Sequence, residues 1–375
     1  MKIAFTAPMK PLDHPLPSGD RTMGRLIVRA LEHAGHEVEV ATTFRSWCRD
    51  GGEAQQAGIR RRALAEADKI ERDWTDRGNR PDLFLTYHLY HKAPDWIGPA
   101  LADRFGLPYA VVEASRAPKR QTGDWSLGFA AADEALLRAD AVAAIQNADA
   151  ECLRAVVSPE KLQVLLPFLD EAPFQSASDV PKPLTALPLK LLAVGMFRDD
   201  VKTRSYELLA QALAQLQNDA WRLTIVGDGP NRDHVLALFP PERVDWLGAV
   251  APDHLPPVYA RHDLVVWPAL REAFGFVFLE AQAAGVGVIA GDTFGVPDIV
   301  ENGVTGLLSP EGDADAFAAN MKRVLEEPAM ADRLGHAARG HIAEHHSLAG
   351  GAARLDAFIK KAVRNHAARQ DADTA

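Results

Sequence analysis

Cysteine is scarce in this chain: only Cys48 and Cys152 occur among its 375 residues. Two cysteines exclude a disulfide-rich scaffold and match no metal-ligand spacing, so a reducing compartment is the simpler expectation. Long apolar runs are missing as well, since none approaches the ~18 residues of a membrane span. The first eight residues predict one short strand ending in proline, without the longer apolar region of a signal peptide. We therefore expect a cytoplasmic protein.

Positive charge is also in short supply. The chain has 41 Lys and Arg against 51 Asp and Glu, which gives a net charge of −10. A nucleic-acid-binding domain needs a basic surface, so we expect no nucleic-acid partner. The acidic excess lies mainly after residue 170, and the more balanced first part leaves open a weak peripheral contact with the anionic inner face of a membrane.

The order of apolar and polar segments predicts an α/β protein. Short apolar runs alternate with longer helical patterns, which is typical of parallel strands joined by helices. The length favours two domains. The expected strands are 2–6, 37–41, 82–86, 109–112, 141–145 and 163–166 in a first series, and 189–194, 221–226, 244–247, 264–267, 286–290 and 305–308 in a second.

Two doubly wound, Rossmann-like domains follow from these two series. We expect an N-terminal domain at 1–170 that a last helix at 348–369 completes, and a C-terminal domain at 188–347. The Pro- and Ser-rich segment 171–187 is expected to be the linker. Residues 370–375 are expected to form a disordered tail. Ligands of such sheets bind at the carboxyl ends of the strands, so two facing domains would form a cleft.

Two carboxylates eight positions apart are the most informative feature of the second series. Glu272 lies in a polar loop after the apolar run 264–268, and Glu280 lies inside an apolar helix that Phe274 and Gly275 would open. An ionised Glu in apolar surroundings is costly unless a partner holds it, and sugar or ribose hydroxyls are suitable partners. The start of the helix, at Phe276, would offer free N–H groups to a phosphate. The alternative is one capping and one exposed carboxylate.

Other candidate ligands follow the first two strands of this series. Gly195 ends one strand and would let backbone approach a ligand. Arg198, Lys202 and Arg204 follow it and are natural grips for a diphosphate. A tight turn after the next strand is a candidate cradle for a phosphate or base, and its residues are Gly227, Asp228 and Gly229. A solvated loop and a common glycine turn are the alternatives.

Polar residues also follow three strands of the first series. Their side chains would lie at the carboxyl edge of the sheet, facing an acceptor or the transferred group. A turn with a helix cap and a structural histidine are the alternatives. The candidates are Gly19, Asp20, Arg21, His88, Glu113 and Arg116.

The ordered motifs of the second half resemble those of the retaining family 4 glycosyltransferases of GT-B fold. These motifs are Gly195…Arg198…Lys202, the turn at 227–230, the Glu-x7-Glu pair and the segment 295–308. The resemblance covers residues 189–310 closely and the first half mainly in its strand rhythm. It implies two Rossmann-like domains that face each other across a cleft, with the C-terminal helix packing back toward the N-terminal domain.

Specific roles also follow from the resemblance. It places Glu272 near the donor sugar and Glu280 on the ribose hydroxyls of a nucleotide-diphosphate sugar. The backbone of Phe274, Gly275 and Phe276 would face the diphosphate, which Arg198 and Lys202 would bind while stabilising the leaving group. It implies no cofactor and no divalent metal ion, and the Asp-x-Asp strings at 313–315 and 371–373 are discounted as metal sites.

Three departures from the family pattern put the acceptor side in doubt. Met196 follows Gly195 where an Arg is common, so its role moves to Arg198. The usual His after a middle strand of the first domain is replaced by Glu113 or Ala114. The interdomain Pro-Asn-Gly string is replaced by residues 167–170.

The expected function is that of a hexosyltransferase. It would move a sugar from a UDP- or GDP-sugar to a glycan, lipid or small-molecule acceptor, with the anomeric configuration retained. A nucleotide-sugar epimerase on the same fold and a non-catalytic nucleotide-sugar-binding protein remain alternatives. A phosphorylase would need a pyridoxal phosphate lysine, for which the sequence offers no strong candidate. An NAD-dependent oxidoreductase is disfavoured, because the first strand is followed by no Gly-x-Gly-x-x-Gly fingerprint.

Overall fold

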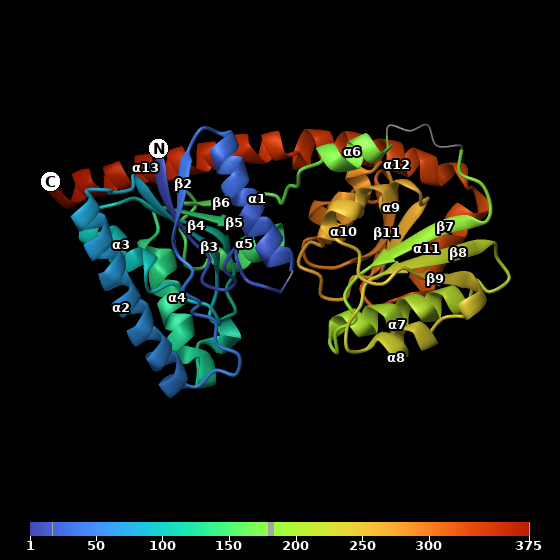
Figure 1. Cartoon of the computed structure of the whole chain (residues 1–375), viewed down its shortest axis with the longest axis horizontal. Helices are drawn as coiled ribbons and strands as arrows, with labels where there is room; N and C mark the ends of the chain where they lie inside the picture. Colours follow the sequence, from blue (N-terminus) through green and yellow to red (C-terminus); the bar gives the residue numbers. More distant parts are fainter. Residues whose placement is uncertain (17, 179–183, 375) are drawn as a thin grey trace. The chain divides into compact units, whose positions relative to one another are not determined.

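The chain divides into two compact α/β units (Figure 1). The computed structural model describes residues 1–16, 18–178 and 184–374. The first unit is discontinuous and consists of Met1–Pro167 and Leu348–Ala375, and the second is Phe168–Ser347. No helix in the described ranges is both long and apolar enough to cross a bilayer.

A six-stranded parallel sheet forms the centre of the first unit, in the order β2-β1-β3-β4-β5-β6. Its central strands are buried on both faces, as the continuous apolar runs require. The strands are β1 (Lys2–Thr6), β2 (Glu37–Thr42), β3 (Leu83–Leu89), β4 (Tyr109–Ala114), β5 (Ala141–Ala144) and β6 (Leu162–Val164).

Helices cover both faces of this sheet. The helices are α1 (Gly19–His33), α2 (Glu53–Arg77), α3 (Gly98–Phe105), α4 (Ser126–Arg138), α5 (Asn147–Leu153) and α13 (Leu348–Thr374), with 3₁₀ turns η1 (Pro118–Arg120) and η2 (Gly123–Trp125). Helices α1 and α13 pack together on one face, while α2, α3 and α4 pack on the other (Figure 1). Helix α2 buries a stripe at helical spacing, formed by Ile59, Ala63, Ala67, Ile70 and Trp74.

The second unit repeats this architecture, with strand order β12-β11-β10-β7-β8-β9 and all pairs parallel. The strands are β7 (Leu189–Val194), β8 (Trp221–Val226), β9 (Val244–Trp246), β10 (Leu264–Trp267), β11 (Gly287–Asp292) and β12 (Gly306–Pro310). In both sheets the order reverses next to the first strand of the unit, between β1 and β3 and between β7 and β10.

Helices α7, α8 and α11 cover one face of the second sheet, and α9, α10 and α12 cover the other (Figure 1). Their bounds are α6 (Ala172–Ser178), α7 (Val201–Ala214), α8 (Arg232–Ala237), α9 (Pro256–Ala260), α10 (Phe276–Ala283), α11 (Ala314–Glu326) and α12 (Ala329–His341). Shorter turns are η3 (Pro241–Arg243), η4 (Pro252–His254), η5 (Val296–Asp298) and the π-helical η6 (Ile342–His346).

A buried carboxylate ties α13 to the first unit. Asp140 is fully buried next to β5, and it accepts hydrogen bonds from Arg369 Nε (3.0 Å) and from the backbone N–H of Tyr109 (3.0 Å). His366 Nδ1 lies 3.2 Å from the same carboxylate. The C-terminal helix therefore belongs to the first unit, although the whole second unit separates the two in sequence.

The structure confirms the predicted fold class, two doubly wound α/β units, and corrects two details. The expected linker 171–187 contains helix α6, while its residues 179–183 lie outside the described residues. The expected disordered tail 370–375 is helical as far as Thr374, because α13 continues past its predicted end at residue 369.

Candidate functional site

The predicted donor residues gather where the strand order of the second sheet reverses. In doubly wound sheets, ligands bind at the carboxyl edge at this point of reversal, which here lies between β7 and β10. The β7 loop leads through Gly195 and Arg198 into α7. The β10 loop carries Glu272 into α10.

Glu272 and Lys202 form an ion pair at this edge. Lys202 Nζ contacts Glu272 Oε2 and lies 5.6 Å from the centre of the Trp267 ring. The loop bearing Glu272 is strained, because Ala269 and Arg271 have φ values of +57° and +50°. Non-glycine residues rarely adopt this conformation, and such strain is concentrated at functional sites.

The other two predicted cations lie apart from this pair. Arg198 is exposed, and its guanidinium lies 3.3 Å from the sulfur of Met196. Arg204 is also exposed and follows Lys202 by two positions on α7, so the two side chains leave different faces of the helix. The structure brings Lys202 to Glu272 and does not bring Arg204 there.

Helix α10 begins with free backbone donors. Gly275 occupies the N-cap with φ +74°, and no side chain among the described residues caps the helix. A Cβ at Gly275 would lie 2.9 Å from the Phe278 ring and 3.1 Å from Glu272 Cγ, so only glycine fits. The first N–H groups of the helix, on Phe276 and Val277, have no acceptor within it. An anion is a suitable partner for them.

Glu280 lies one turn further along α10 and is partly buried. Tyr259 on α9 donates its hydroxyl to Glu280 Oε2 at 2.6 Å. Burial raises the pKa of Glu280 to about 7, although the Tyr259 hydrogen bond opposes this shift. Oε1 is the oxygen through which Glu280 can accept from a ligand hydroxyl, as the predicted ribose contact requires.

The glycine turn after β8 packs against the loop after β7. A Cβ at Gly227 would overlap the carbonyl oxygen of Gly195, and one at Gly229 would lie 2.5 Å from Phe197 O. Asp228 is held by Arg232, whose Nε lies 2.8 Å from Oδ1. These glycines allow close backbone packing, and the Asp228 carboxylate is already engaged. The turn that was predicted to bind a phosphate or base therefore packs against the β7 loop and supports it.

A second cluster occupies the corresponding edge of the first sheet. His88 Nδ1 lies 3.2 Å from Asp20 Oδ1 and 3.3 Å from Glu113 Oε1. Asp20 lies in the first turn of α1, while His88 and Glu113 lie near the ends of β3 and β4. Both strand residues are left-handed, with φ values of +61° and +60°. The sequence predicted each residue separately, and the fold brings them together.

Mutual burial determines the charges of this cluster. Burial would raise the pKa of Asp20, but contact with His88 lowers it to about 2. Burial would lower the pKa of His88, but Glu113 and Asp20 raise it to about 9. Burial raises the pKa of Glu113 to about 7 against the attraction of His88. His88 is therefore an imidazolium at neutral pH, held between two carboxyl groups.

These three residues also form the one group, within the described ranges, whose ligand atoms are close enough to share a metal ion. One ligand atom from each lies within 4.8 Å of the others. Asp20 and Glu113 raise the pKa of His88 to about 9, so the protonated ring competes with a metal ion for the same two carboxyl groups. The absence of a metal ion from the function therefore stays a prediction.

The remaining predicted residues of the first unit have structural contacts. Gly19 is the first residue of α1, whose N-cap is Ser18. Arg21 donates to the carbonyl oxygen of His14 at 2.7 Å, and Arg116 makes a bidentate pair with Asp133 at 2.9 and 2.8 Å. Neither arginine contacts the Asp20–His88–Glu113 cluster.

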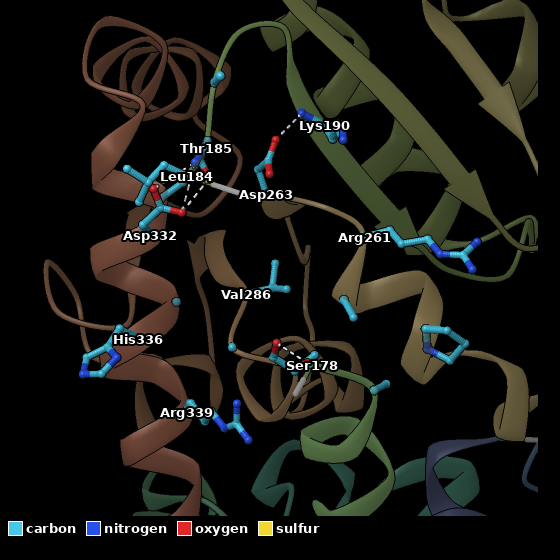
Figure 2. A pocket seen from close by; sticks show the side chains of 18 of the residues that line it. Ser178, Leu184, Thr185, Lys190, Arg261, Asp263, Val286, Asp332, His336 and Arg339 are labelled. Carbon is cyan, nitrogen blue, oxygen red and sulfur yellow. Dashed lines mark hydrogen bonds between the residues drawn. The ribbon is translucent and has the colours of Figure 1, made fainter. Parts of the chain in front are cut away.

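A cavity of about 960 Å³ lies at the opposite, amino edge of the second sheet. Figure 2 shows that both of its carboxylates are engaged: Asp332 accepts from Thr185, and Asp263 accepts from the backbone N–H of Lys190. Ser178 donates to the carbonyl oxygen of Ala284 at 2.7 Å. This cavity is therefore separate from the predicted donor residues, and its polar side chains make structural hydrogen bonds.

Sequence reasoning missed several residues that complete these sites. Tyr259 was not predicted as the partner of Glu280, since a tyrosine in a short helix carries no signal of its own. Gln146 and Asp149, which follow β5, adjoin the first cluster. Their place directly after the neighbouring strand was the signal that could have revealed them.

Comparisons with known proteins match the second unit to a family model and most of the chain to individual proteins. Residues 188–341 match the family model described as glycosyl transferases group 1. Sulfoquinovosyl transferase SQD2 of Arabidopsis thaliana is 32% identical over 155 residues, 40% of this chain and 30% of that protein. Glycogen synthase of Mycobacterium tuberculosis H37Rv is 28% identical over 344 residues, 87% of this chain and 78% of that protein. The chain thus spans less than a third of the plant relative and most of the mycobacterial one.

The fold is also that of solved structures. Anabaena Alr3699/HepE in complex with UDP superposes with a TM-score of 0.72 at 18% sequence identity, covering 96% of this chain and 100% of that one. At this identity the likeness concerns the fold.

Proposed function

Residues 188–341 belong to the glycosyl transferases group 1 family within a chain of GT-B fold, and from this premise we propose that the protein is a retaining hexosyltransferase. Its donor is a nucleotide-diphosphate sugar, and its acceptor contributes a hydroxyl group. No metal ion takes part in this proposal.

One observation carries the proposal. The Glu272–Lys202 pair lies beside the uncapped start of α10, at the point where the strand order of the second sheet reverses. This edge combines a cation and free N–H groups with two carboxylates. The positive groups suit a diphosphate, and the carboxylates suit the hydroxyls on either side of it.

Each group has a part in the proposed transfer. Lys202, Arg198 and the N–H groups of Phe276 and Val277 neutralise the charge that develops on the departing nucleotide diphosphate. Glu280 accepts from the ribose hydroxyls through Oε1, while Tyr259 fixes its orientation. Glu272 orients the sugar, and a bound diphosphate would compete with it for Lys202.

Retention follows from the resemblance to family 4 enzymes. The acceptor attacks the face that the nucleotide leaves, and an oxygen of the leaving phosphate assists removal of the hydroxyl proton. UDP-sugars are the first donors to test, because the Anabaena structure of the same fold was solved with UDP.

Thermal unfolding of the full chain with UDP, GDP, ADP and their sugars tests the donor site. A ligand at 100 times its dissociation constant should stabilise the fold by about 2.7 kcal/mol. Glu280→Ala should abolish the shift, whereas Glu326→Ala, at an exposed position of α11, should keep it. Stabilisation by no nucleotide, or an unchanged shift in Glu280→Ala, would contradict the proposal.

Product analysis separates transfer from the alternatives. A glycosyltransferase releases nucleotide in proportion to the glycoside formed, with the donor's anomeric configuration, and continues to do so in EDTA. An epimerase would release a modified sugar without any acceptor, and a binding protein would release no nucleotide at all.

A further inference from the structure

The carboxyl edge of the first sheet has an unusual excess of carboxyl groups. Asp20 and Asp149 lie in the first turns of α1 and α5, and Glu113 lies near the end of β4, around the imidazolium of His88. Asp149 interacts electrostatically with both His88 and Glu113, so the four side chains form one cluster, called here the acidic edge. Within the acidic edge one imidazolium faces three carboxyl groups, while Lys10 and Arg45 act electrostatically on Asp20 from outside it.

The cations near the acidic edge are engaged elsewhere or by the edge itself. Arg21 donates to backbone carbonyl oxygens, and Arg116 is paired with Asp133. Arg45 donates to the carbonyl oxygen of Met9 at 2.8 Å and stacks on Trp47. Lys10 acts on Asp20. Each of the three arginines therefore already has a protein partner and is not available to bind an anion.

A separate observation indicates that a ligand belongs at this edge. Gln146, which is 5% exposed, donates its amide N–H to Asp149 at 2.6 Å, but its Oε1 has no hydrogen-bond partner in the described part of the chain. Glu113, which is 8% exposed, has the buried hydroxyl of Tyr87 as its neighbour. Buried polar atoms are nearly always satisfied. The orphaned oxygen of Gln146 therefore points to a ligand that supplies a hydroxyl donor.

We propose that the acidic edge binds the acceptor of the transfer, and that this acceptor is an uncharged polyhydroxyl compound, a sugar or polyol, rather than a phosphorylated or carboxylated one. The inference rests on the proposed glycosyltransferase function and adds the acceptor class to it. Hydroxyl groups donate to the oxygens of Glu113, Gln146 and Asp20.

The charge of the acidic edge supplies the selectivity. A hydroxyl gains a charge-assisted hydrogen bond from each carboxylate it meets. A phosphate ester replaces one hydroxyl donor with acceptor oxygens and adds one to two negative charges, so this group offers no donor to the edge and is repelled by the carboxylates. His88 cannot offset this repulsion, because its charge is already shared between Asp20 and Glu113.

Matched acceptors test the inference on the full chain. Glucose, fructose, maltose and myo-inositol are each compared with a monophosphate ester of the same compound, using a donor that stabilises the protein in thermal unfolding. We expect transfer to at least one neutral compound, with kcat/KM at least about tenfold above that of its ester, the effect of one hydrogen bond to a charged group. An ester that matches or exceeds its neutral counterpart overturns the inference. Donor hydrolysis without transfer to any neutral compound overturns it as well.

Failure of the proposed function gives a different result. If the chain binds no nucleotide sugar, the donor site is contradicted, and both proposals fail with it. A chain that binds and hydrolyses the donor but prefers phosphate esters keeps the donor site and loses only the acceptor class.

Variants show whether the acidic edge is responsible. Glu113→Gln should raise the KM for the neutral acceptor about tenfold and reduce the preference over its ester, while the donor KM stays within about twofold. Glu134→Gln, an exposed position on α4, is the matched control and should change nothing. Asp20→Asn provides a second test if Glu113→Gln unfolds. If the role of Glu113 were purely structural, the variant would lower kcat/KM equally for the neutral acceptor and for its ester, and that outcome overturns the inference.

Discussion

Glu280 favours ligand binding in the proposed site, but its ionisation lowers the free energy of unfolding of the ligand-free protein. Its pKa of about 7 lies well above the ordinary 4.5, so the folded state holds the proton more tightly than the unfolded chain does. The stability that this shift contributes is present below pH 4.5, and it is lost as the pH rises to about 7. Above pH 7 an ionised carboxylate sits in a partly buried position with only Tyr259 to support it.

Replacing Glu280 with Gln should therefore stabilise the free chain in mildly alkaline solution. We expect Glu280→Gln to raise the free energy of unfolding at pH 8 by roughly 1–3 kcal/mol and to change it little at pH 4.5. The same variant should lose most of the stabilisation by nucleotide. Urea unfolding at both pH values, with Glu326→Gln as the exposed control, measures the difference. An equal effect at pH 4.5 and pH 8 would show that ionisation is not the cause.

Two glycines with positive φ differ in what surrounds them. Gly227 faces the carbonyl oxygen of Gly195, whereas Gly303 has φ +81° and no heavy atom within 4 Å of a built Cβ. Gly303→Ala should cost about 1 kcal/mol, the strain of a left-handed alanine. Gly227→Ala adds a backbone overlap and should cost more than about 3 kcal/mol. Chemical denaturation of both variants provides the measurement, and similar losses would refute the packing role of Gly227.

Sequence reasoning at the residue scale predicted the carriers of charge but not their partners. Glu272, Glu280 and Lys202 were predicted because carboxylates and cations near strand ends suggest ligands. The contact between Lys202 and Glu272 joins residues 70 positions apart, so it depends on the β7–β10 neighbourhood that only the fold supplies. Such a contact cannot be predicted from the spacing of residues along the sequence.

The strands show how far apolar patterning extends. All the predicted strands occur close to their expected positions. The central strands are buried on both faces and give continuous apolar runs, whereas the edge strands β2, β6 and β9 are only partly buried. The ends of β3 and β4 were placed too early, because the polar His88 and Glu113 interrupt the apolar run. Pairing nevertheless continues through Tyr87↔Val112 and Leu89↔Ala114. Polar residues inside a strand end therefore mark the candidate site rather than the limit of the sheet.

The first turn of α7 provides a test of side-chain direction. Asp200 caps the helix by accepting from the N–H of Lys202 at 2.8 Å, which fixes Lys202 toward the β10 loop. Arg204 leaves the helix on another face. We expect Lys202→Ala to reduce kcat/KM at least about hundredfold, the effect of losing a charge-assisted contact with the diphosphate. Arg204→Ala should reduce it less than about threefold. Equal losses in steady-state assays would place Arg204 in the site after all.

The first unit depends on a helix that the chain reaches only after completing the second unit. The fully buried Asp140 accepts from Arg369, from Arg138 and from the backbone N–H of Tyr109, so its loss removes several hydrogen bonds at once and leaves that buried N–H without its acceptor. Asp140→Ala should cost about 3–5 kcal/mol. Lys360→Ala, which removes only the exposed pair with Asp356 on the same helix, should cost about 1 kcal/mol or less. Comparable losses in urea unfolding would show that Asp140 does not anchor α13.

The discontinuity of the first unit makes the two halves unequal as isolated fragments. Fragment 168–347 contains every strand and helix of the second unit, together with Lys202, Glu272 and Glu280. It should unfold cooperatively and be stabilised by the nucleotide that stabilises the full chain.

Fragment 1–167 lacks α13, whose Leu355, Phe358 and Ile359 are at most 1% exposed in the full chain. Each such side chain contributes about 1.5–3 kcal/mol when buried, which together is comparable to the whole stability of a domain. We therefore expect this fragment to lack a cooperative thermal transition. Adding residues 348–374 through a flexible linker should restore it, whereas the same linker carrying those three positions as Ser should not. A fragment 1–167 that melts cooperatively by itself would mean that α13 covers a unit already stable without it.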